Sequence, residues 1–273
     1  MGPLEGLSNS GTFNTGSLTN KGIEVIGNVD VVKGAKLNVS VNAHATYNRN
    51  RITKLTLSDS PNDLGQQTGG IGGGVGNTIQ VNSVGYSAQS FYVAQQVYDQ
   101  SGKPLQGIYV DRNGDNAINS SDYYRYKSAR PDYLLGAGAN IGYGGASLAF
   151  TMRANIGNYI YNNVRSGAYF DPSSAGFVSN VNREAVNSGF NTAQYFSDYF
   201  IENGSFLRME NITLGYNFGS LVKKDSNLSL SFAVQNAFLV TKYKGLDPEV
   251  IGGIDNTIYP RPRTFTVGLN LGI

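Results

Sequence analysis

The chain lacks several residue types on which common protein functions depend. It has no cysteine among its 273 residues, which excludes disulfides, thiolate nucleophiles and cysteine-ligated zinc. Tryptophan is also absent, and the single histidine, His44, has no second histidine with which to share a metal ion. The Gly-x-Ser-x-Gly pattern of serine hydrolases does not occur. Thiol, zinc-thiolate and serine-hydrolase chemistry therefore has no candidate residues.

Charge and long apolar runs are also scarce. Only 15% of residues are charged, and 21 Lys and Arg nearly balance 19 Asp and Glu without a basic run, so nucleic-acid binding has no electrostatic basis. No stretch approaches the roughly 18 apolar residues of a transmembrane helix. The segment Met1–Gly6 has neither the basic nor the apolar region of a signal peptide. We therefore expect either a chain that is not exported or a part of a longer one.

Glycine (35), tyrosine (18) and phenylalanine (13) are abundant, which favours strands and turns over long helices. The final stretch, Thr264–Ile273, carries Phe, Val, Leu and Ile at odd positions and Thr, Gly and Asn at even positions. A strand would present one apolar and one polar face over this whole length. Ordinary strands need about 5–6 residues, whereas a tilted strand needs about 9–11 to cross a bilayer. The stretch therefore has the pattern of a membrane strand.

The same alternation predicts about seven long strands. They lie near residues 19–31, 37–47, 133–143, 147–156, 211–218, 228–235 and 264–273. The connections between them are alternately short and long, as in outer-membrane barrels with periplasmic turns and extracellular loops. We predict an all-β fold, an antiparallel transmembrane β-barrel segment with long extracellular loops. Bacterial barrels use an even number of strands, so the chain is expected to be a piece of a larger barrel.

Two further expectations follow from this arrangement. Arg208 and Glu210 fall on the apolar parity of their strand, so we place them at the membrane rim, where Arg can extend its charge into water. Aromatic residues at strand ends should form the interfacial girdles. These residues are Tyr47, Tyr143, Tyr159, Tyr161, Phe218 and Phe238.

Two other classes of protein stay open at this point. A soluble or surface-exposed β-sheet module, either a carbohydrate-binding domain or an adhesin, would also alternate, although with strands of about half this length. A glycan hydrolase fragment would need two carboxylates at catalytic separation. Asp247, Glu249 and Asp255 are the candidates, but they lie in a loop rich in Pro and Gly, where solvated charges are the simpler expectation. We predict no catalytic residues.

Several short motifs occur in an order that is familiar. They are Leu18–Glu24, Asn48–Ile52, Gln96–Asp99, Asp111–Asp115, Phe206–Tyr216, Gly245–Glu249 and Tyr259–Phe265. Together they resemble the C-terminal part of SusC/RagA-type TonB-dependent transporters of Bacteroidetes outer membranes. The resemblance covers nearly the whole chain from about Gly16.

The resemblance implies a barrel of about 22 strands around an N-terminal plug, located in the cell outer membrane. Residues 1–273 would form the C-terminal part of that barrel, with no plug domain. The resemblance further implies TonB, acting through the missing N-terminal part, a SusD-type surface lipoprotein partner, contact with outer-membrane lipid, and glycans or peptides as imported substrates. Such barrels usually end on an aromatic residue, whereas this chain ends on Ile273.

One loop has the spacing of a calcium site. Oxygen ligands occur at positions 1, 3, 5, 9 and 12, with a backbone carbonyl available at position 7, as in an EF-hand loop. The residues are Asp111, Asn113, Asp115, Ala117, Asn119 and Asp122. The loop departs from the EF-hand pattern in having Asn116 in place of Gly, and Asp122 in place of Glu. The alternative is a turn held by hydrogen bonds from Asx side chains to the backbone.

Two loops are rich in aromatic and amide side chains. Residues 86–98 contain Tyr86, Phe91 and Tyr92, and residues 159–200 contain Tyr159, Tyr161, Tyr169, Phe170, Tyr195 and Tyr199. Aromatic faces stack on sugars or pack against proteins, and amides form adaptable hydrogen bonds. These loops are the predicted ligand or partner surface, while packing within the loops themselves remains open for each residue.

Overall fold

The computed structural model describes residues 16–55, 63–73, 76–171, 183–220 and 226–272. Met1–Gly6 and Ile273, on which two of the expectations above depend, lie outside these ranges.

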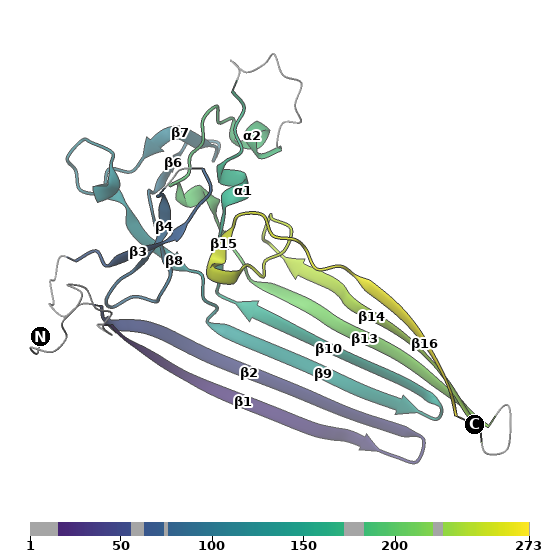
Figure 1. Ribbon diagram of the computed structural model, residues 1–273. Coiled ribbons are helices and arrows are strands. Elements are labelled where there is room, and N and C mark those ends of the chain that lie inside the picture. The colour runs from purple at the N-terminus through teal and green to yellow at the C-terminus, as the bar shows by residue number, and fades with distance from the viewer. Residues whose placement is uncertain (1–15, 56–62, 74–75, 172–182, 221–225, 273) are drawn as a thin grey trace, which may run out of the picture.

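A seven-stranded antiparallel sheet forms the elongated part of the molecule (Figure 1). Its strands are β1 (Ser17–Lys33), β2 (Leu37–Lys54), β9 (Tyr133–Tyr143), β10 (Ala146–Ile156), β13 (Phe206–Gly219), β14 (Asn227–Thr241) and β16 (Thr264–Gly272). Their order in the sheet follows their order in the chain. The strands are 9 to 18 residues long, enough to cross a bilayer at a tilt. The seven strands predicted from alternation are confirmed.

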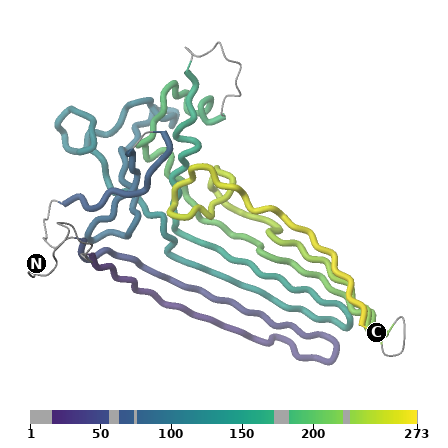
Figure 2. Tube along the Cα trace, in the orientation of Figure 1, coloured from purple at the N-terminus to yellow at the C-terminus, as the bar shows by residue number. Residues whose placement is uncertain are grey.

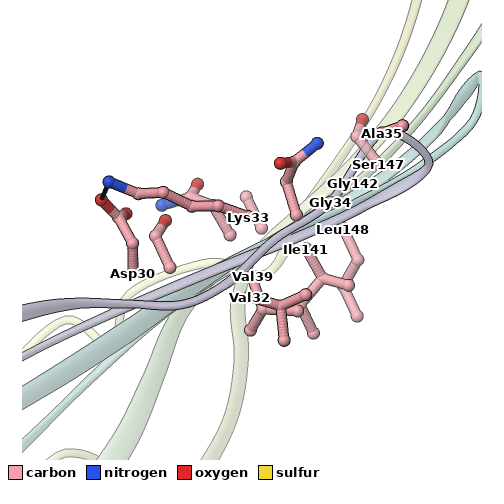
Figure 3. A pocket seen from close by; sticks show the side chains of 14 residues that line it. Asp30, Val32, Lys33, Gly34, Ala35, Val39, Ile141, Gly142, Ser147 and Leu148 are labelled. Carbon is pink, nitrogen blue, oxygen red and sulfur yellow. Dashed lines mark ion pairs between the residues drawn. The ribbon is translucent and has the colours of Figure 1, made fainter.

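The sheet has one apolar and one polar face. Cross-strand pairs join apolar residues along one side, for example Phe150 with Ile212 and Leu214 with Phe232. Near the turns, Val39, Ile141 and Leu148 point to the side of the sheet opposite Asp30 and Lys33 (Figure 3). An open hollow of about 820 Å³ at this end is lined by residues from both faces, so it is not an enclosed site.

On the polar face of β2 and β9, one side chain of β2 packs directly over a glycine of β9. His44 pairs with Gly136, and a Cβ built on Gly136 would lie 2.0 Å from the His44 ring. The imidazole therefore lies over a position where only hydrogen fits without movement. His44 stands on the polar side of its strand, as the alternation predicted.

The short connections lie at one end of the sheet and the long ones at the other (Figure 2). Residues 34–36 and 144–145 form tight turns. A hydrogen bond joins the two turns, because the Gly144 amide donates to the Lys36 carbonyl at 2.9 Å. The described parts of the long connections are residues 63–73, 76–132, 157–171, 183–205 and 242–263. We call these residues the cap.

The cap contains three small sheets. One joins β3 (Gln66–Gly70), β4 (Thr78–Asn82), β5 (Ser90–Val93) and β8 (Tyr124–Ser128); a second joins β12 (Ile201–Asn203), β11 (Tyr159–Asn162) and β15 (Ile254–Asp255); and a third joins β6 (Gln96–Tyr98) and β7 (Pro104–Tyr109). The helices are α1 (Asn163–Ser166), α2 (Arg183–Ser188) and three 3-10 turns at Ser120–Asp122, Asp198–Phe200 and Ile251–Gly253. None of the helices in the described part of the chain is long and apolar enough to span a bilayer.

The hydrophobic core lies in the cap and not in the sheet. It consists of Ile71, Ile79, Phe91, Val93, Tyr161, Phe190, Phe200 and Ile201, all buried. These residues come from two long connections, the one between β2 and β9 and the one between β10 and β13, and Ile254 of the connection before β16 packs against them. The long connection between β2 and β9 is therefore a packed part of the cap. Within it β6 pairs with β7, while Phe91 lies in β5, which pairs with β4 and β8.

Of the six expected girdle residues, Tyr143, Phe218 and Phe238 lie exposed near strand ends. Tyr47 is also exposed but lies inside β2, where it pairs with Tyr133, the first residue of β9. Tyr47 also packs against Tyr133, with ring centroids 5.2 Å apart. Tyr161 is instead fully buried in the cap core and Tyr159 packs against that core. The strand β10 ends at Ile156, before these two residues, which is why they do not join the girdle.

Candidate functional site

A β-bulge reverses the expected position of Arg208. Thr151 pairs with Asn211 but Met152 pairs with Met209, so Glu210 is an extra residue in β13. An extra residue changes which face the preceding side chains occupy. Arg208 consequently pairs with Arg153 on the polar face, and it is 1% exposed. The prediction of a rim arginine extending into water is wrong because alternation alone does not record the bulge.

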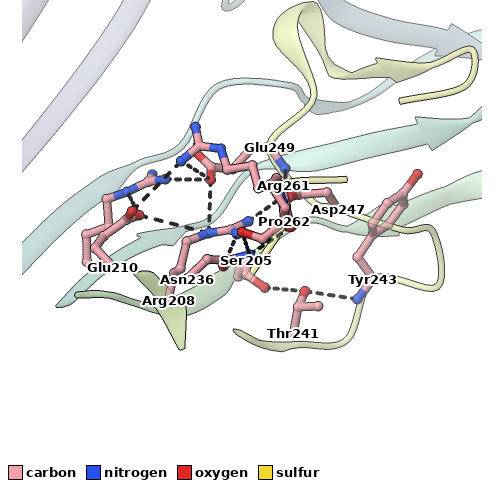
Figure 4. A network of polar contacts seen from close by, with 11 residues as sticks. Ser205, Arg208, Glu210, Asn236, Thr241, Tyr243, Asp247, Glu249, Arg261 and Pro262 are labelled. Carbon is pink, nitrogen blue, oxygen red and sulfur yellow. Dashed lines mark hydrogen bonds and ion pairs between the residues drawn. The ribbon is translucent and has the colours of Figure 1, made fainter. Parts of the chain in front are cut away.

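Arg208 is the centre of an ion cluster that joins the sheet to the cap (Figure 4). Its Nη2 lies 2.6 Å from Asp247 Oδ1 and its Nε lies 3.0 Å from Glu249 Oε2. Its Nη1 donates to Asn236 Oδ1 at 2.7 Å. Asn236 has a left-handed backbone (φ 52°), which asparagine tolerates better than most residues. The arginine thus binds a neighbouring strand and the connection that follows it.

Two further arginines complete this cluster. Arg153 contacts Glu210 and Glu249, each at 2.5 Å, and the exposed Arg261 lies 3.4 Å from Glu249. Three cations therefore face Glu210, Asp247 and Glu249, and the buried charges are mutually compensated.

The acidic residues of the 241–263 connection are structural and not solvated. Asp247 and Asp255 are buried, and the Tyr243 hydroxyl donates to Asp255 Oδ2 at 2.6 Å. Burial, followed by the hydrogen bond to Asp255, raises the pKa of Tyr243. The expectation of solvated loop charges is wrong, because each carboxylate that could have formed a catalytic pair is engaged by an arginine, a tyrosine or backbone amides.

A second buried arginine holds the cap together. Arg165 donates from Nε to Glu184 Oε2 at 2.9 Å, and its Nη1 pairs with Glu202. Glu202 also accepts from the Lys244 amide at 2.8 Å. The Tyr199 hydroxyl donates to Glu184 at 2.8 Å, and burial together with this bond raises the pKa of Tyr199 to about 12. The cluster connects α1, α2, β12 and the final connection.

A hollow of about 480 Å³ opens beside this second cluster. It is lined by three separate segments, with the charged and amide side chains Arg183, Asn187 and Lys244 beside the apolar Val164, Leu246 and Ile258. A surface with both donors and acceptors suits a ligand rich in hydroxyl or amide groups. Sequence reasoning missed this hollow because its residues are brought together only by the fold of the cap.

The predicted calcium loop is closed on itself by hydrogen bonds. Asp111 accepts from the Gly114 and Asn116 amides at 2.6 and 2.8 Å, and Asp122 accepts from the Arg112 and Asn119 amides, each at 2.9 Å. These bonds, led by the one from the Asn119 amide, lower the pKa of Asp122. The backbone is left-handed at Asn116 (φ 63°), the conformation for which EF-hand loops use glycine.

The other predicted ligands share this closed arrangement. Asn113 and Asp115 bond to each other at 2.9 Å, the Ala117 amide donates to Asp115 at 2.8 Å, and Asn119 caps the 3-10 turn that ends at Asp122. Among the described residues, no three His, Cys, Asp or Glu side chains are gathered closely enough to hold a metal ion. The loop backbone therefore has the required turn, while the side-chain oxygens point to amides.

The aromatic residues of the two predicted surface loops divide into two groups. Phe91 and Tyr161 are 0% exposed and belong to the core, and Tyr159, Tyr195 and Tyr199 pack against it. Among the described residues of these loops, the exposed rings are Tyr86, Tyr98, Tyr169 and Phe170, each about half exposed. Only this second group is available to a ligand or partner.

Comparisons with known proteins identify relatives of this chain. No family model matches the chain. TonB-dependent receptor SusC of Bacteroides thetaiotaomicron is 41% identical over 272 residues, which is 95% of this chain and 27% of SusC. TonB-dependent receptor P3 of Formosa agariphila is 25% identical over 94% of this chain and 29% of that receptor. The chain thus spans under a third of the length of these curated relatives.

Solved structures give the same result for the fold. The structure of the RagAB peptide transporter matches with a TM-score of 0.73 and 24% identity, over 94% of this chain and 29% of that one. The RagAB peptide importer in its closed-closed state matches with a TM-score of 0.70. These structures share the fold of this chain over 94% of its length. The chain therefore belongs to the family of SusC/RagA-type TonB-dependent receptors, which are β-barrel proteins of the outer membrane.

Proposed function

We propose that this chain belongs to a TonB-dependent transporter that imports oligosaccharides or peptides across the outer membrane. In this proposal the seven long strands contribute barrel wall, and the cap contributes the extracellular surface that meets the substrate. The observation that carries the proposal is the 41% identity to SusC along 95% of the chain. The RagAB peptide transporter, which has the same fold, supports the inclusion of peptides.

The cap has the chemistry that such substrates need. Its open hollow of about 480 Å³ offers charged and amide groups. Tyr169 and Phe170 have exposed rings and follow, a few residues later in the chain, the lining residues Val164 and Arg165. Rings that stack on sugar faces or peptide side chains, combined with amide donors and acceptors, are common in sites for both classes of ligand. The buried ion clusters hold this surface in one conformation.

The partners follow from the same proposal. A SusD-type lipoprotein would dock on the outer surface of the cap, where Tyr98 and Tyr259 are exposed. TonB would act through the part of the receptor that lies outside this chain. Calcium would bind the loop 111–122 by drawing the Asp111, Asp115 and Asp122 carboxylates away from their amide donors, with the left-handed turn at Asn116 already in place.

The rival function, a soluble or surface carbohydrate-binding module, accounts less well for the sheet. A soluble module would have to cover an apolar face seven strands wide, because exposed apolar patches above a few hundred Å² are rare in soluble proteins. The relatives are receptors and transporters and not enzymes. The proposal accordingly gives this chain a role in transport and none in catalysis.

Uptake by whole cells tests the proposal. Cells that carry the complete receptor, cells from which it is deleted, and cells without TonB would be given labelled oligosaccharides and labelled peptides. We expect at least one class of label to enter only when both the receptor and TonB are present. Equal uptake of every label in all three strains, with the receptor found in the outer membrane of the first, would contradict the proposal.

A further inference from the structure

Three cations lie together where β1 and β2 meet the cap. Lys21 pairs directly with Arg49, and Thr19 pairs with Arg51 in the next position on the same face. Directly opposed residues in a sheet have Cβ atoms about 5 Å apart, and residues two apart on a strand are separated by about 7 Å. The three charged groups can therefore reach one common point.

These cations share the face of the apolar residues. The register of β1 and β2 runs without a bulge from Thr19 and Arg51 to Val29 and Val41. Side chains at odd positions therefore stay on one side throughout. The cations continue the row of Ile23 and Val25 toward the cap, beyond Tyr47, which pairs with Ile23. In a membrane this places them on the lipid side, directly above the hydrocarbon band and its aromatic girdle.

The three charges lack the compensation found elsewhere in the molecule. Arg153, Arg165, Arg208 and Arg261 all form ion pairs. Within the residues that the structure describes, the side chains of Lys21, Arg49 and Arg51 form no ion pair or hydrogen bond, and all three are exposed. Like charges directly opposite one another in a sheet are destabilising. An arrangement of this kind favours an external anion.

The cap supplies a roof to this cluster. A hollow of about 530 Å³ is lined by Lys21, Arg49, Arg51, neighbouring strand residues and the cap residues Val84 and Gly85, with no acidic residue in its wall. The roof is fixed to β2, because the Gly85 amide donates to the Ile52 carbonyl at 2.8 Å and the Ile52 amide donates to the Tyr86 carbonyl at 2.9 Å. Arg51 Nη2 lies 3.6 Å from the position of a Cβ on Gly85, so its guanidinium rests against this roof.

We propose that this hollow binds the phosphate group of a phosphorylated lipid in the outer leaflet. The phosphate accepts hydrogen bonds from Arg49, Arg51 and Lys21, and the acyl chains lie along Ile23 and Val25. Arginine is well suited to phosphate because its planar fork can donate two parallel bonds. A lipid is favoured over a soluble anion because the cations stand on the apolar side of the sheet at the interfacial level. The inference rests on the outer-membrane function proposed above.

Retention of lipid by the complete receptor tests the inference. The receptor would be purified in mild detergent and examined by native mass spectrometry after addition of diphosphorylated lipid A or its dephosphorylated form. We expect the wild type to retain the phosphorylated lipid, and the R49Q/R51Q double variant to retain at least about tenfold less. The matched control is K33Q/K36Q, which removes two cations at the opposite end of the same hairpin and should behave as the wild type.

Three results would overturn the inference: equal retention by R49Q/R51Q and wild type, equal retention of the dephosphorylated lipid, or displacement of the lipid by millimolar inorganic phosphate, which would indicate a soluble-anion site. Substrate uptake by cells with the R49Q/R51Q receptor separates the two proposals. If the R49Q/R51Q receptor still takes up substrate and retains as much lipid as the wild type, only the lipid site is contradicted. If the wild type takes up no substrate, the proposed function is contradicted.

Discussion

Buried arginines and their acids determine, at the residue scale, how the cap is attached. Arg208 connects β13 to the 241–263 connection, and Arg165 connects the two helices of the cap to β12. A buried ion pair contributes little net free energy compared with apolar packing, but removal of one partner leaves an uncompensated buried charge. These side chains therefore mainly determine how the cap segments are arranged, and they add little to the net stability of the fold.

Replacement of Arg208 by Met should detach the 241–263 connection. The change leaves Asp247 and Glu249 without their central cation, at a cost of about 3–5 kcal/mol. Limited proteolysis of the complete receptor in detergent should then cut within residues 242–263, where the wild type resists. Arg261→Met, at a half-exposed member of the same cluster, should cost under about 1 kcal/mol and leave the pattern unchanged. Equal resistance of R208M and R261M would contradict this role of Arg208.

Asp198 should make the cap less stable as the pH rises. Its Oδ2 accepts from the Tyr124 hydroxyl at 2.7 Å, but burial is the larger influence and raises the pKa of Asp198. The folded cap then holds this proton more tightly than the unfolded chain, so stability falls as the pH rises through the folded pKa. Asp198→Asn should be the more stable protein at neutral pH, and the two should converge in acid.

The measurement is hydrogen exchange of cap amides between about pH 4 and pH 8, corrected for intrinsic rates. Asp99→Asn is the contrasting variant, because the Ser101 hydroxyl lowers the pKa of the exposed Asp99. Its carboxylate stabilises the fold above its unfolded pKa, and that stability is lost as the pH falls. Equal pH dependence for wild type and D198N would disprove the assignment to Asp198.

Single residues were predictable only where the alternation was unbroken. His44 could be assigned to the polar face because no bulge intervenes in β2 between it and Val41. Arg208 could not, since the extra residue at Glu210 changes the parity. The one available signal was that two charged residues fell on an apolar parity, and a bulge explains this better than a rim position. Asp247 is buried against Arg208, so its burial could not be predicted without knowledge of the bulge.

At the scale of elements, the bulge in β13 is the feature on which the junction between sheet and cap depends. Insertion of one alanine between Thr151 and Met152 should give Glu210 a partner, restore simple alternation in β13 and turn Arg208 and Arg153 toward the lipid. An unpaired arginine there costs about 2–4 kcal/mol near the bilayer centre and less toward its interfaces. We expect the insertion variant to be lost from the outer membrane or to lose the heat-modifiable mobility of a folded barrel. Glu210→Gln keeps the residue count and should assemble normally. Normal assembly of the insertion variant would contradict the argument.

The loop 111–122 gives a second prediction at this scale. If calcium draws the carboxylates together, calorimetric titration of EDTA-treated receptor should show binding, and amides of the loop should become more protected from exchange. Asp111→Asn combined with Asp122→Asn should abolish the heat of binding, while Asp99→Asn should not change it. Absence of heat with the wild type would leave the loop as a turn held by Asx side chains.

Elements of the sheet could be predicted and those of the cap could not. A strand in lipid must keep its apolar face over its full length, so β2 and β16 display their periodicity in the sequence. Cap strands such as β5 and β15, four and two residues long, are too short for a periodic signal. The fold of the cap depends on how these strands pair with segments of other connections, and the local sequence does not predict that pairing.

The molecule as a whole combines a sheet whose apolar side chains are exposed with a cap that has its own buried core. Val267 and Leu269, on the last strand, are each 71% exposed. Such a sheet is stable only if another phase covers its apolar face, and a bilayer supplies one. The barrel-wall role proposed for the strands depends on this division of the sheet into a lipid side and a water side.

Spin-label accessibility of the complete receptor in lipid bilayers tests this division most directly. Labels would be placed at Phe232, Val267 and Leu269 on the apolar face, and at Ser231 and Asn270 on the polar face. We predict that the first three are accessible to oxygen and shielded from a water-soluble nickel reagent, and that the other two show the reverse. Nickel accessibility at Phe232, Val267 and Leu269, or shielding of these positions from both reagents, would contradict the account.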